Sequence, residues 1–308
     1  MEYISEKMDF HLKNTAISLG KFDGIHQGHR MLIDRILEEK VHGRTSVVFT
    51  FSLHPMSLFS DKELELIDTE EEKAEKLRDL GVDVLISYPF TKQTANTEPE
   101  EFVRKVLVEQ LDAKVIVVGV DYRFGKQRKG DVELLRKLSD QYGYELIVYD
   151  KLQIEHHIVS STLIRNELST GNIKFVNELL GVPYCIKGEV IYGNQVGRTI
   201  DVPTVNQQVP KTKLLPPNGV YASRILIKDQ SYEGITNIGC KPTVSSEKVK
   251  GVETHIFDYT GNLYGEVIEV QLYDYLRPEK KFDSLEELKK QIAEDTKRVK
   301  MFFASQNK

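Results

Sequence analysis

The sequence has few cysteines, no excess of positive charge and no long apolar segment. Its two cysteines, Cys185 and Cys240, form neither a CxxC motif nor a cysteine–histidine ligand spacing, as is typical of a reducing compartment. The formal net charge of −5 gives no general attraction to nucleic acid or to an anionic membrane. No apolar run is long enough to span a bilayer, and residues 1–13 lack the apolar core of a signal peptide. We therefore expect a cytoplasmic protein whose partners are small molecules rather than nucleic acid or membrane, and the sequence sets no oligomeric state.

The composition is that of an ordinary globular chain. The 308 residues are 40% hydrophobic and 29% charged, which excludes the disordered and fibrous classes, and the length favours two domains. In the first half, short β-rich apolar segments alternate with amphipathic helical segments. Strands are expected at Thr15–Leu19, Ser46–Phe51, Val82–Ser87, Lys114–Val118 and Glu145–Val148, and helices at Arg30–Lys40, Glu70–Leu80, Pro99–Leu111 and Val132–Tyr142. This alternation predicts an α/β domain with a doubly wound, Rossmann-like parallel sheet.

The second half has a different texture. Two helical segments, 162–170 and 173–180, end at glycines, and Pro183 prevents continuation, so we expect domains at 1–183 and 184–308. Strand patterns separated by Gly, Asn and Pro turns follow at Ile186–Tyr192, Gly219–Ile227, Tyr232–Ile238, Glu253–Asp258 and Val267–Tyr275. Ser284 and Glu287 have the spacing of a capping box at the start of a helix that continues to Phe303. These patterns predict a small antiparallel β-barrel with a C-terminal helix.

The first expected strand is followed by the run Gly-Lys-Phe-Asp-Gly-Ile-His-Gln-Gly-His at 20–29 and then by a helix. A glycine turn between a strand and a helix is a phosphate-binding arrangement, because the helix N-terminus offers unpaired N–H donors to an anion. His26 and His29 can face one direction across Gly28, whereas a chance tetrapeptide or a pair of capping histidines is the alternative reading. The run resembles the signature of the FMN adenylyltransferase (FAD synthetase) branch of the nucleotidyltransferases. The resemblance implies that both histidines are catalytic and contact ATP phosphates, in a site lined by Gly20, Phe22, Asp23, Gly24 and Gly28.

Two further segments resemble motifs of the same family. Ser160–Arg165 matches SSTxIR, which implies phosphate binding by Ser161, Thr162 and Arg165, although hydroxyls at a helix start also serve as simple N-caps. The segment 119–131 resembles GxDFxFGxxxxGD, which makes Asp121, Phe124 and Arg128 candidate flavin-binding residues. A solvated basic turn is the alternative.

Thr50–Pro55 resembles the family's TFDPHP, but Ser52 and Leu53 replace an acidic residue and a proline. We therefore assign no role to Ser52.

The C-terminal half resembles riboflavin kinase. The segment Gly197–Asn206 matches GRxLGFPTAN and 219–222 matches GVYA, which implies phosphate binding at Gly197. Thr204 and Asn206 carry hard oxygen ligands suited to Mg²⁺ and its nucleotide phosphates, although PTxN is also typical of a turn entering a strand. Glu253 is the candidate catalytic base for the riboflavin hydroxyl, with an exposed strand carboxylate as the alternative. Arg277, in Tyr-Leu-Arg-Pro-Glu, is a candidate flavin-binding residue.

The resemblance covers 16–296 and implies an enzyme of FAD biosynthesis. It phosphorylates riboflavin to FMN and adenylylates FMN to FAD, with ATP as substrate and Mg²⁺ as cofactor. Asp201-Val202 replaces the kinase family's Gly-Phe and places a charge near the expected phosphates. Three alternatives stay open: an adenylyltransferase with an impaired kinase domain, a non-catalytic flavin or nucleotide sensor, and an adenylyltransferase with another acceptor.

Overall fold

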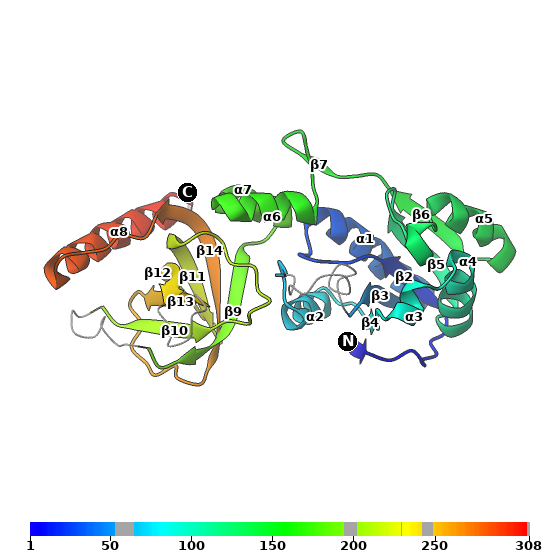
Figure 1. Cartoon of the computed structure of the whole chain (residues 1–308), viewed down its shortest axis with the longest axis horizontal. Helices are drawn as coiled ribbons and strands as arrows, with labels where there is room; N and C mark the ends of the chain where they lie inside the picture. Colours follow the sequence, from blue (N-terminus) through cyan, green and yellow to red (C-terminus); the bar gives the residue numbers. More distant parts are fainter. Residues whose placement is uncertain (53–64, 194–201, 229, 242–248, 307–308) are drawn as a thin grey trace. The chain divides into compact units, whose positions relative to one another are not determined.

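The computed structural model describes residues 1–52, 65–193, 202–228, 230–241 and 249–306 (Figure 1). It divides the chain into two units, Met1–Ser161 and Thr162–Lys308. Among the described residues, no helix is both long and apolar enough to cross a membrane.

Six parallel strands form the sheet of the first unit, in the order β1-β4-β3-β2-β5-β6. Their bounds are Glu2–Ser5 (β1), Thr15–Leu19 (β2), Thr45–Phe51 (β3), Val84–Tyr88 (β4), Ala113–Gly119 (β5) and Glu145–Tyr149 (β6). The last five confirm the strands predicted from the sequence. The edge strand β1 was not predicted, because Ile4 is its only buried residue and the segment therefore lacks an apolar pattern.

Helices pack on both faces of this sheet and produce two separate cores. The helices are α1 (Gln27–Glu38), α2 (Glu70–Asp79), α3 (Lys92–Ala95), α4 (Pro99–Phe102) with its π-helical continuation η3 (Val103–Gln110), and α5 (Val132–Tyr142). Successive strand residues alternate between the cores: Ala16 packs with residues of α1 and α2, and Ile17 with residues of η3 and α5. The predicted doubly wound arrangement is confirmed.

The sheet has its topological switch point at β2. From β2 the chain builds β3 and β4 on one side and later β5 and β6 on the other. The loops that leave the carboxyl ends of β2 and β5 therefore start from neighbouring strands, where open α/β sheets bind their ligands. These loops hold the 20–29 and 119–131 motifs.

Short elements complete the first unit and lead into the second. They are the 3₁₀ turns η1 (Glu39–His42) and η4 (Lys126–Arg128), the hairpin of β7 (Gln153–Ile154) and β8 (His157–Ile158), and the helices α6 (Ser161–Thr170) and α7 (Ile173–Leu180). Asn177 on α7 donates from Nδ2 to the Leu272 carbonyl, and its Oδ1 accepts from the Tyr184 backbone N–H. These bonds join α7 to the barrel, and the two units divide between Ser161 and Thr162, near the start of α6. The functional boundary expected after Pro183 stays a prediction.

A closed antiparallel barrel forms most of the second unit, in the order β10-β13-β12-β11-β14-β9. The strands are β9 (Tyr184–Ile191), β10 (Thr204–Gln208), β11 (Gly219–Ile227), β12 (Gln230–Lys241), β13 (Val249–Ile256) and β14 (Val267–Arg277). Because closure leaves no free edge, every strand has two partners. The predicted antiparallel barrel is confirmed, with β10 as an additional strand.

Helix α8 (Leu285–Gln306) covers part of the barrel's outer face. Ser284 accepts from the Glu287 backbone N–H at its first turn, as the capping-box spacing predicts. Val299 and Phe303 pack on outward-facing residues of β11 and β12. Arg277 at the end of β14 donates from Nε and Nη2 to the Asp295 carboxylate at 3.0 and 2.8 Å. Because Asp295 is 4% exposed, this forked ion pair anchors the helix.

Replacing Asp295 with Ala should lower the free energy of unfolding by about 3 kcal/mol, because it leaves the Arg277 guanidinium partly buried without its carboxylate. Chemical denaturation followed by circular dichroism measures the loss. Glu294→Ala, one residue away and exposed, is the matched control and should change stability by less than about 0.5 kcal/mol. Equal losses in the two variants would contradict the anchoring role.

Candidate active sites

The turn between β2 and α1 has an unusual backbone that brings two histidines together. Phe22 and Gly24 both have positive φ, +49° and +65°. A Cβ atom at Gly24 would lie 2.7 Å from Cγ2 of Ile67, so both the conformation and the space require glycine there. His26 is the N-cap of α1, as its Nδ1 accepts from the His29 backbone N–H at 3.1 Å. The alternative interpretation, that the motif caps a helix, is therefore correct for His26. Capping through Nδ1 does not exclude a further role of the same ring in phosphate binding.

Two buried carboxylates tie the turn to the residues just before α2. The Asp23 carboxylate accepts from the backbone N–H of Ile67 at 2.9 Å, and the Asp68 carboxylate accepts from the backbone N–H of Ile25 at 3.2 Å. Lys76 also donates to Asp68, at 2.6 Å. The exchange is reciprocal, so each segment fixes the backbone of the other. The bond to Ile67 shows that the Asp23 carboxylate helps to fix the turn, and its predicted place in the phosphate site stays a prediction.

The imidazoles of His26 and His29 lie face to face. Their centroids are 3.6 Å apart and their planes differ by 12°. Nδ1 of His29 lies 3.0 Å from the Gly24 carbonyl, so this nitrogen carries a proton and donates it. Nδ1 of His26 accepts a backbone N–H, so the proton of its neutral ring is on Nε2. Gly28, as expected, leaves room beside the pair: a Cβ there would lie 3.3 Å from the His26 ring.

Burial makes both histidines poor bases. Desolvation, together with the neighbouring His29, lowers the pKa of His26 to about 2. Desolvation also lowers the pKa of His29 to about 4, against opposing effects of the Gly24 carbonyl and of the carboxylates of Asp23 and Asp68. Both rings are therefore neutral at pH 7 while no anion is bound.

The start of α6 returns to this turn. Ser161 donates from Oγ to the backbone carbonyl of Asp23 at 2.7 Å, across 138 residues of sequence. The structure thus brings Ser161 to the histidine turn, as the motif implies. Thr162 is the next residue and is exposed, and Arg165 lies one turn further along the helix and is half-buried. Both belong to the second unit, and their phosphate contacts stay predictions.

The loop after β5 has a buried base and an exposed tip. The Phe124 ring is 4% exposed in the core, where it packs 5.7 Å from the Phe102 ring. Asp121 forms an ion pair with Lys151 at 2.8 Å. At the tip, Arg128 has φ +58° and an exposed side chain. Flavin binding by Asp121, Phe124 and Arg128 stays a prediction. Of the three side chains, Phe124 is the least available to a flavin, because its ring is packed in the core.

A second group of polar residues lies in a row across the barrel. In the strand register, Asn206 of β10 and Asn237 of β12 both lie opposite Glu253 of β13. Residues opposite one another point to the same face. Since the adjacent Val252 and Thr254 are fully buried inside the barrel, the row lies on the outer face.

Thr204 joins this row from two residues before Asn206. Its hydroxyl donates to the Glu253 carboxylate at 2.5 Å. Asn206 is 5% exposed and lies against the backbone of Gly193, where a Cβ would meet its amide. Three of the barrel residues expected to be functional, Thr204, Asn206 and Glu253, are therefore brought together.

The oxygen atoms of this row fit a hard cation. Donation from Thr204 to Glu253 leaves the hydroxyl lone pairs available, and the Asn206 amide supplies a second neutral oxygen. No group of three His, Cys, Asp or Glu that could hold a metal by itself occurs in the described ranges. Mg²⁺ therefore fits here as an ion shared with nucleotide phosphates. Gly197 and Asp201 lie outside the described residues.

Other expected contacts differ in outcome. The Gly20 Cα faces the Phe22 ring, where a Cβ would lie 3.0 Å away, so these two residues shape the turn together. The Arg277 guanidinium is bound to the Asp295 carboxylate. A contact between Arg277 and flavin stays a prediction, and the ion pair with Asp295 does not support it.

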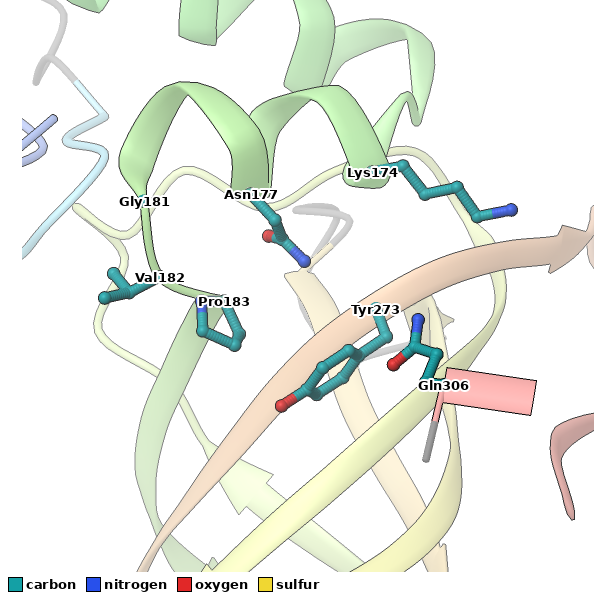
Figure 2. A pocket seen from close by; sticks show the side chains of 7 residues that line it. All are labelled: Lys174, Asn177, Gly181, Val182, Pro183, Tyr273 and Gln306. Atoms are coloured by element: carbon teal, nitrogen blue, oxygen red, sulfur yellow. The ribbon is translucent and has the colours of Figure 1, made fainter. Parts of the chain in front are cut away.

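A hollow of about 330 Å³ lies in the second unit, near α7, β14 and the end of α8 (Figure 2). It is lined by Lys174, Asn177, Gly181, Val182, Pro183, Tyr273 and Gln306. Asn177 is engaged in the bonds described above, and Lys174 pairs with Asp274. Since none of the expected site residues lines this hollow, we assign it no role.

Sequence reasoning missed two residues of these sites. Asp68 was missed because its partner Ile25 is 43 residues away, although Thr69 and Glu72 beside it form a capping box that marks a fixed loop end. Asn237 was missed because its place beside Glu253 depends on the strand register.

Comparison with known proteins gives matches over both halves. The FAD synthetase family matches residues 9–163, and the riboflavin kinase family matches residues 180–303. Curated relatives described as bifunctional riboflavin kinase/FMN adenylyltransferase include those of Listeria monocytogenes (36% identity, 94% of this chain and 93% of the relative) and Bacillus subtilis (34%, 96% and 94%). A crystal structure titled macrolide-efflux protein from Streptococcus pneumoniae superposes with a TM-score of 0.88 at 30% identity, covering 97% of this chain and 99% of that one.

Replacing Gly24 with Ala should destabilise the first unit more than Gly43→Ala does. Both glycines have similar positive φ, so each variant carries a conformational cost of about 1–2 kcal/mol. Only Gly24 faces a side chain, Ile67, so overpacking adds about 1–3 kcal/mol there. Denaturant titration of both variants measures the difference, and equal losses would show that the turn is not clamped against Ile67.

Proposed function

Because the chain belongs to the bifunctional riboflavin kinase/FMN adenylyltransferase family, we propose that it makes FAD in two steps at the two sites described above. The barrel transfers the γ-phosphate of ATP to riboflavin, and the parallel-sheet unit transfers AMP from a second ATP to the FMN formed. The observation that carries this proposal is that each matched half of the chain holds its own assembled group of polar side chains. A chain with one active half would need only one such group.

In the adenylyl step, an FMN phosphate oxygen attacks the α-phosphorus of ATP and pyrophosphate leaves. The nucleophile is already ionised, so the step needs no base, and the protein's task is to stabilise charge and hold the reactants in line. Nε2–H of His26 suits a hydrogen bond to the α-phosphate, and the N-terminus of α1 adds backbone donors. The absence of a free carboxylate in the turn supports this assignment, because Asp23 and Asp68 are both bound to backbone N–H groups.

The remaining predicted residues of the first site take supporting roles in this proposal. Ser161 donates to the Asp23 carbonyl and helps to fix the turn. Thr162 and Arg165 are carried over from the family motif as contacts for the β- and γ-phosphates. Arg128 is at the exposed tip of the loop from the neighbouring strand end, and it is the candidate partner for the FMN phosphate. Asp121 and Phe124 shape the same loop.

In the kinase step, the 5′-hydroxyl of riboflavin attacks the γ-phosphorus, the bond to ADP breaks and the hydroxyl proton must leave. Glu253 is the base that accepts this proton. Thr204 donates to this carboxylate and fixes its orientation. Thr204 and Asn206 would hold Mg²⁺ together with the phosphates, and the ion would neutralise charge at the transferred group.

The described part of the kinase site gives no support to an impaired kinase, since Thr204, Asn206 and Glu253 are all present and adjacent. The curated relatives carry both activities in their names, which supports the bifunctional alternative over a sensor. We also propose the cytoplasm as the location, in keeping with two free thiols at Cys185 and Cys240, and 1–183 and 184–308 as the functional domains.

Replacing Glu253 with Gln should lower the rate of FMN formation from riboflavin by at least about 100-fold, because the amide cannot accept the hydroxyl proton. FAD formation from added FMN should be unchanged. Chromatographic separation of the flavins measures both rates in one preparation. Glu189→Gln, at an exposed carboxylate on β9, is the matched control and should leave both rates at wild-type values. An unchanged kinase rate in Glu253→Gln would remove Glu253 from the mechanism.

The double substitution His26→Ala and His29→Ala should have the opposite effect. It should lower FAD formation from FMN by about 100-fold or more, because donors to the transferred phosphate are lost, and it should leave FMN formation from riboflavin intact. The same chromatographic assay measures the result. Loss of both activities together would contradict two independent sites.

A further inference from the structure

We propose that His29 takes up a proton from solvent when ATP binds, so that the phosphates meet one neutral donor, His26, and one cationic donor, His29. The inference rests on the proposed adenylyltransferase function and adds the protonation state of its site. It follows from which nitrogen of each ring is already engaged.

The two Nδ1 atoms are engaged in opposite senses. Nδ1 of His29 donates to the Gly24 carbonyl, whereas Nδ1 of His26 accepts the backbone N–H of His29. Within the described part of the chain, the hydrogen bonds of both rings are made by Nδ1, and no protein group is bonded to either Nε2. Nε2 is therefore the nitrogen of each ring that remains for a ligand. In the neutral state His26 presents Nε2–H, a donor, and His29 presents a bare Nε2, which can only accept.

A bare Nε2 lone pair is unfavourable beside an anion, and only His29 can gain a proton without losing a hydrogen bond. Protonation of His29 adds a hydrogen at Nε2 and keeps its bond to Gly24. Protonation of His26 adds a hydrogen at Nδ1 and breaks its N-cap bond to the His29 N–H. Because the centroids are 3.6 Å apart, two positive charges would repel strongly, so the pair holds a single added proton.

The charged groups around His29 favour the same ring. Asp23 in the turn and Asp68 before α2 both stabilise a positive charge on His29, and Lys73 on α2 opposes it. Lys73 is itself paired with Glu70 at 2.7 Å, and Asp68 is shared with Lys76. The Phe22 ring, whose centroid lies 5.0 Å from that of His29, covers it without adding charge. The arriving phosphates supply the largest negative charge, and an opposite charge at this range raises a pKa by 1–3 units.

The proton has a defined use and a defined fate. It moves from solvent to Nε2 of His29 when ATP binds, strengthens a hydrogen bond to the phosphates and returns to solvent when pyrophosphate leaves. No net proton is consumed by His29 over the cycle. Since binding takes up a proton, the affinity for ATP should rise as the pH is lowered toward the pKa of the free His29, which lies at about 4.

Nitrogen-15 NMR of the imidazole rings in the full chain tests the proposal directly. In the free protein at pH 6, where both free rings are still neutral, His29 should show the Nδ1–H tautomer and His26 the Nε2–H tautomer. On addition of Mg²⁺-ATP without flavin, the His29 signals should change to those of an imidazolium, and His26 should stay neutral. The single variants His26→Asn and His29→Asn assign the signals.

The outcomes separate the two proposals. If His29 responds to ATP but stays neutral, or if His26 becomes the charged ring, the inference is wrong and the adenylyltransferase function stands. If neither ring responds to ATP, both proposals fail.

Calorimetry in two buffers of different ionisation enthalpy gives a second readout that needs no assignment. Wild-type protein should take up more protons per Mg²⁺-ATP than His29→Asn, by up to one, while any ATP bound at the barrel contributes equally to both. Equal uptake in the two proteins would overturn the inference.

Discussion

Two buried carboxylates hold the turn on which the first site depends. Asp23 and Asp68 each accept a backbone N–H from the other's segment, and together they fix a turn whose positive φ values would otherwise be unfavourable. The fixed turn sets the position of His26 as the helix cap, and the cap in turn sets the position of His29. The chemistry of the site is thus imposed by the backbone, because each ring has one nitrogen occupied by a main-chain group.

The two sites differ in the kind of nucleophile they serve. Adenylyl transfer uses a phosphate that is already ionised, and the turn after β2 offers donors while its carboxylates are bound elsewhere. Phosphoryl transfer to riboflavin uses a hydroxyl, and the barrel places the Glu253 carboxylate beside the Thr204 hydroxyl and the Asn206 amide. The presence of a base in one site and its absence from the other follow from the ionisation of the two substrates.

Much of the fold could be predicted from local patterns, because five sheet strands, the barrel and α8 carry strong periodicity or caps. The edge strand β1 and the short polar strand β10 could not, because their partners and not their composition decide their structure. The structure places His26, His29 and Ser161 at one turn and Thr204, Asn206 and Glu253 on one face of the barrel, and the roles that the motifs imply for them stay predictions. Asp68, Asn237 and the pairing of Arg277 with Asp295 depend on contacts distant in sequence, which no local pattern reveals.

The most direct test of two successive transfers is to follow the phosphorus atoms of ATP. Purified protein is given Mg²⁺-ATP labelled at either the γ- or the α-phosphate, with riboflavin or FMN as the acceptor, and the flavins are separated. From riboflavin, the γ-label should appear in FMN and FAD and the α-label in FAD alone. From FMN, only the α-label should enter FAD. Absence of γ-label from FMN when riboflavin is supplied, or γ-label in FAD made from FMN, would contradict the two-site account.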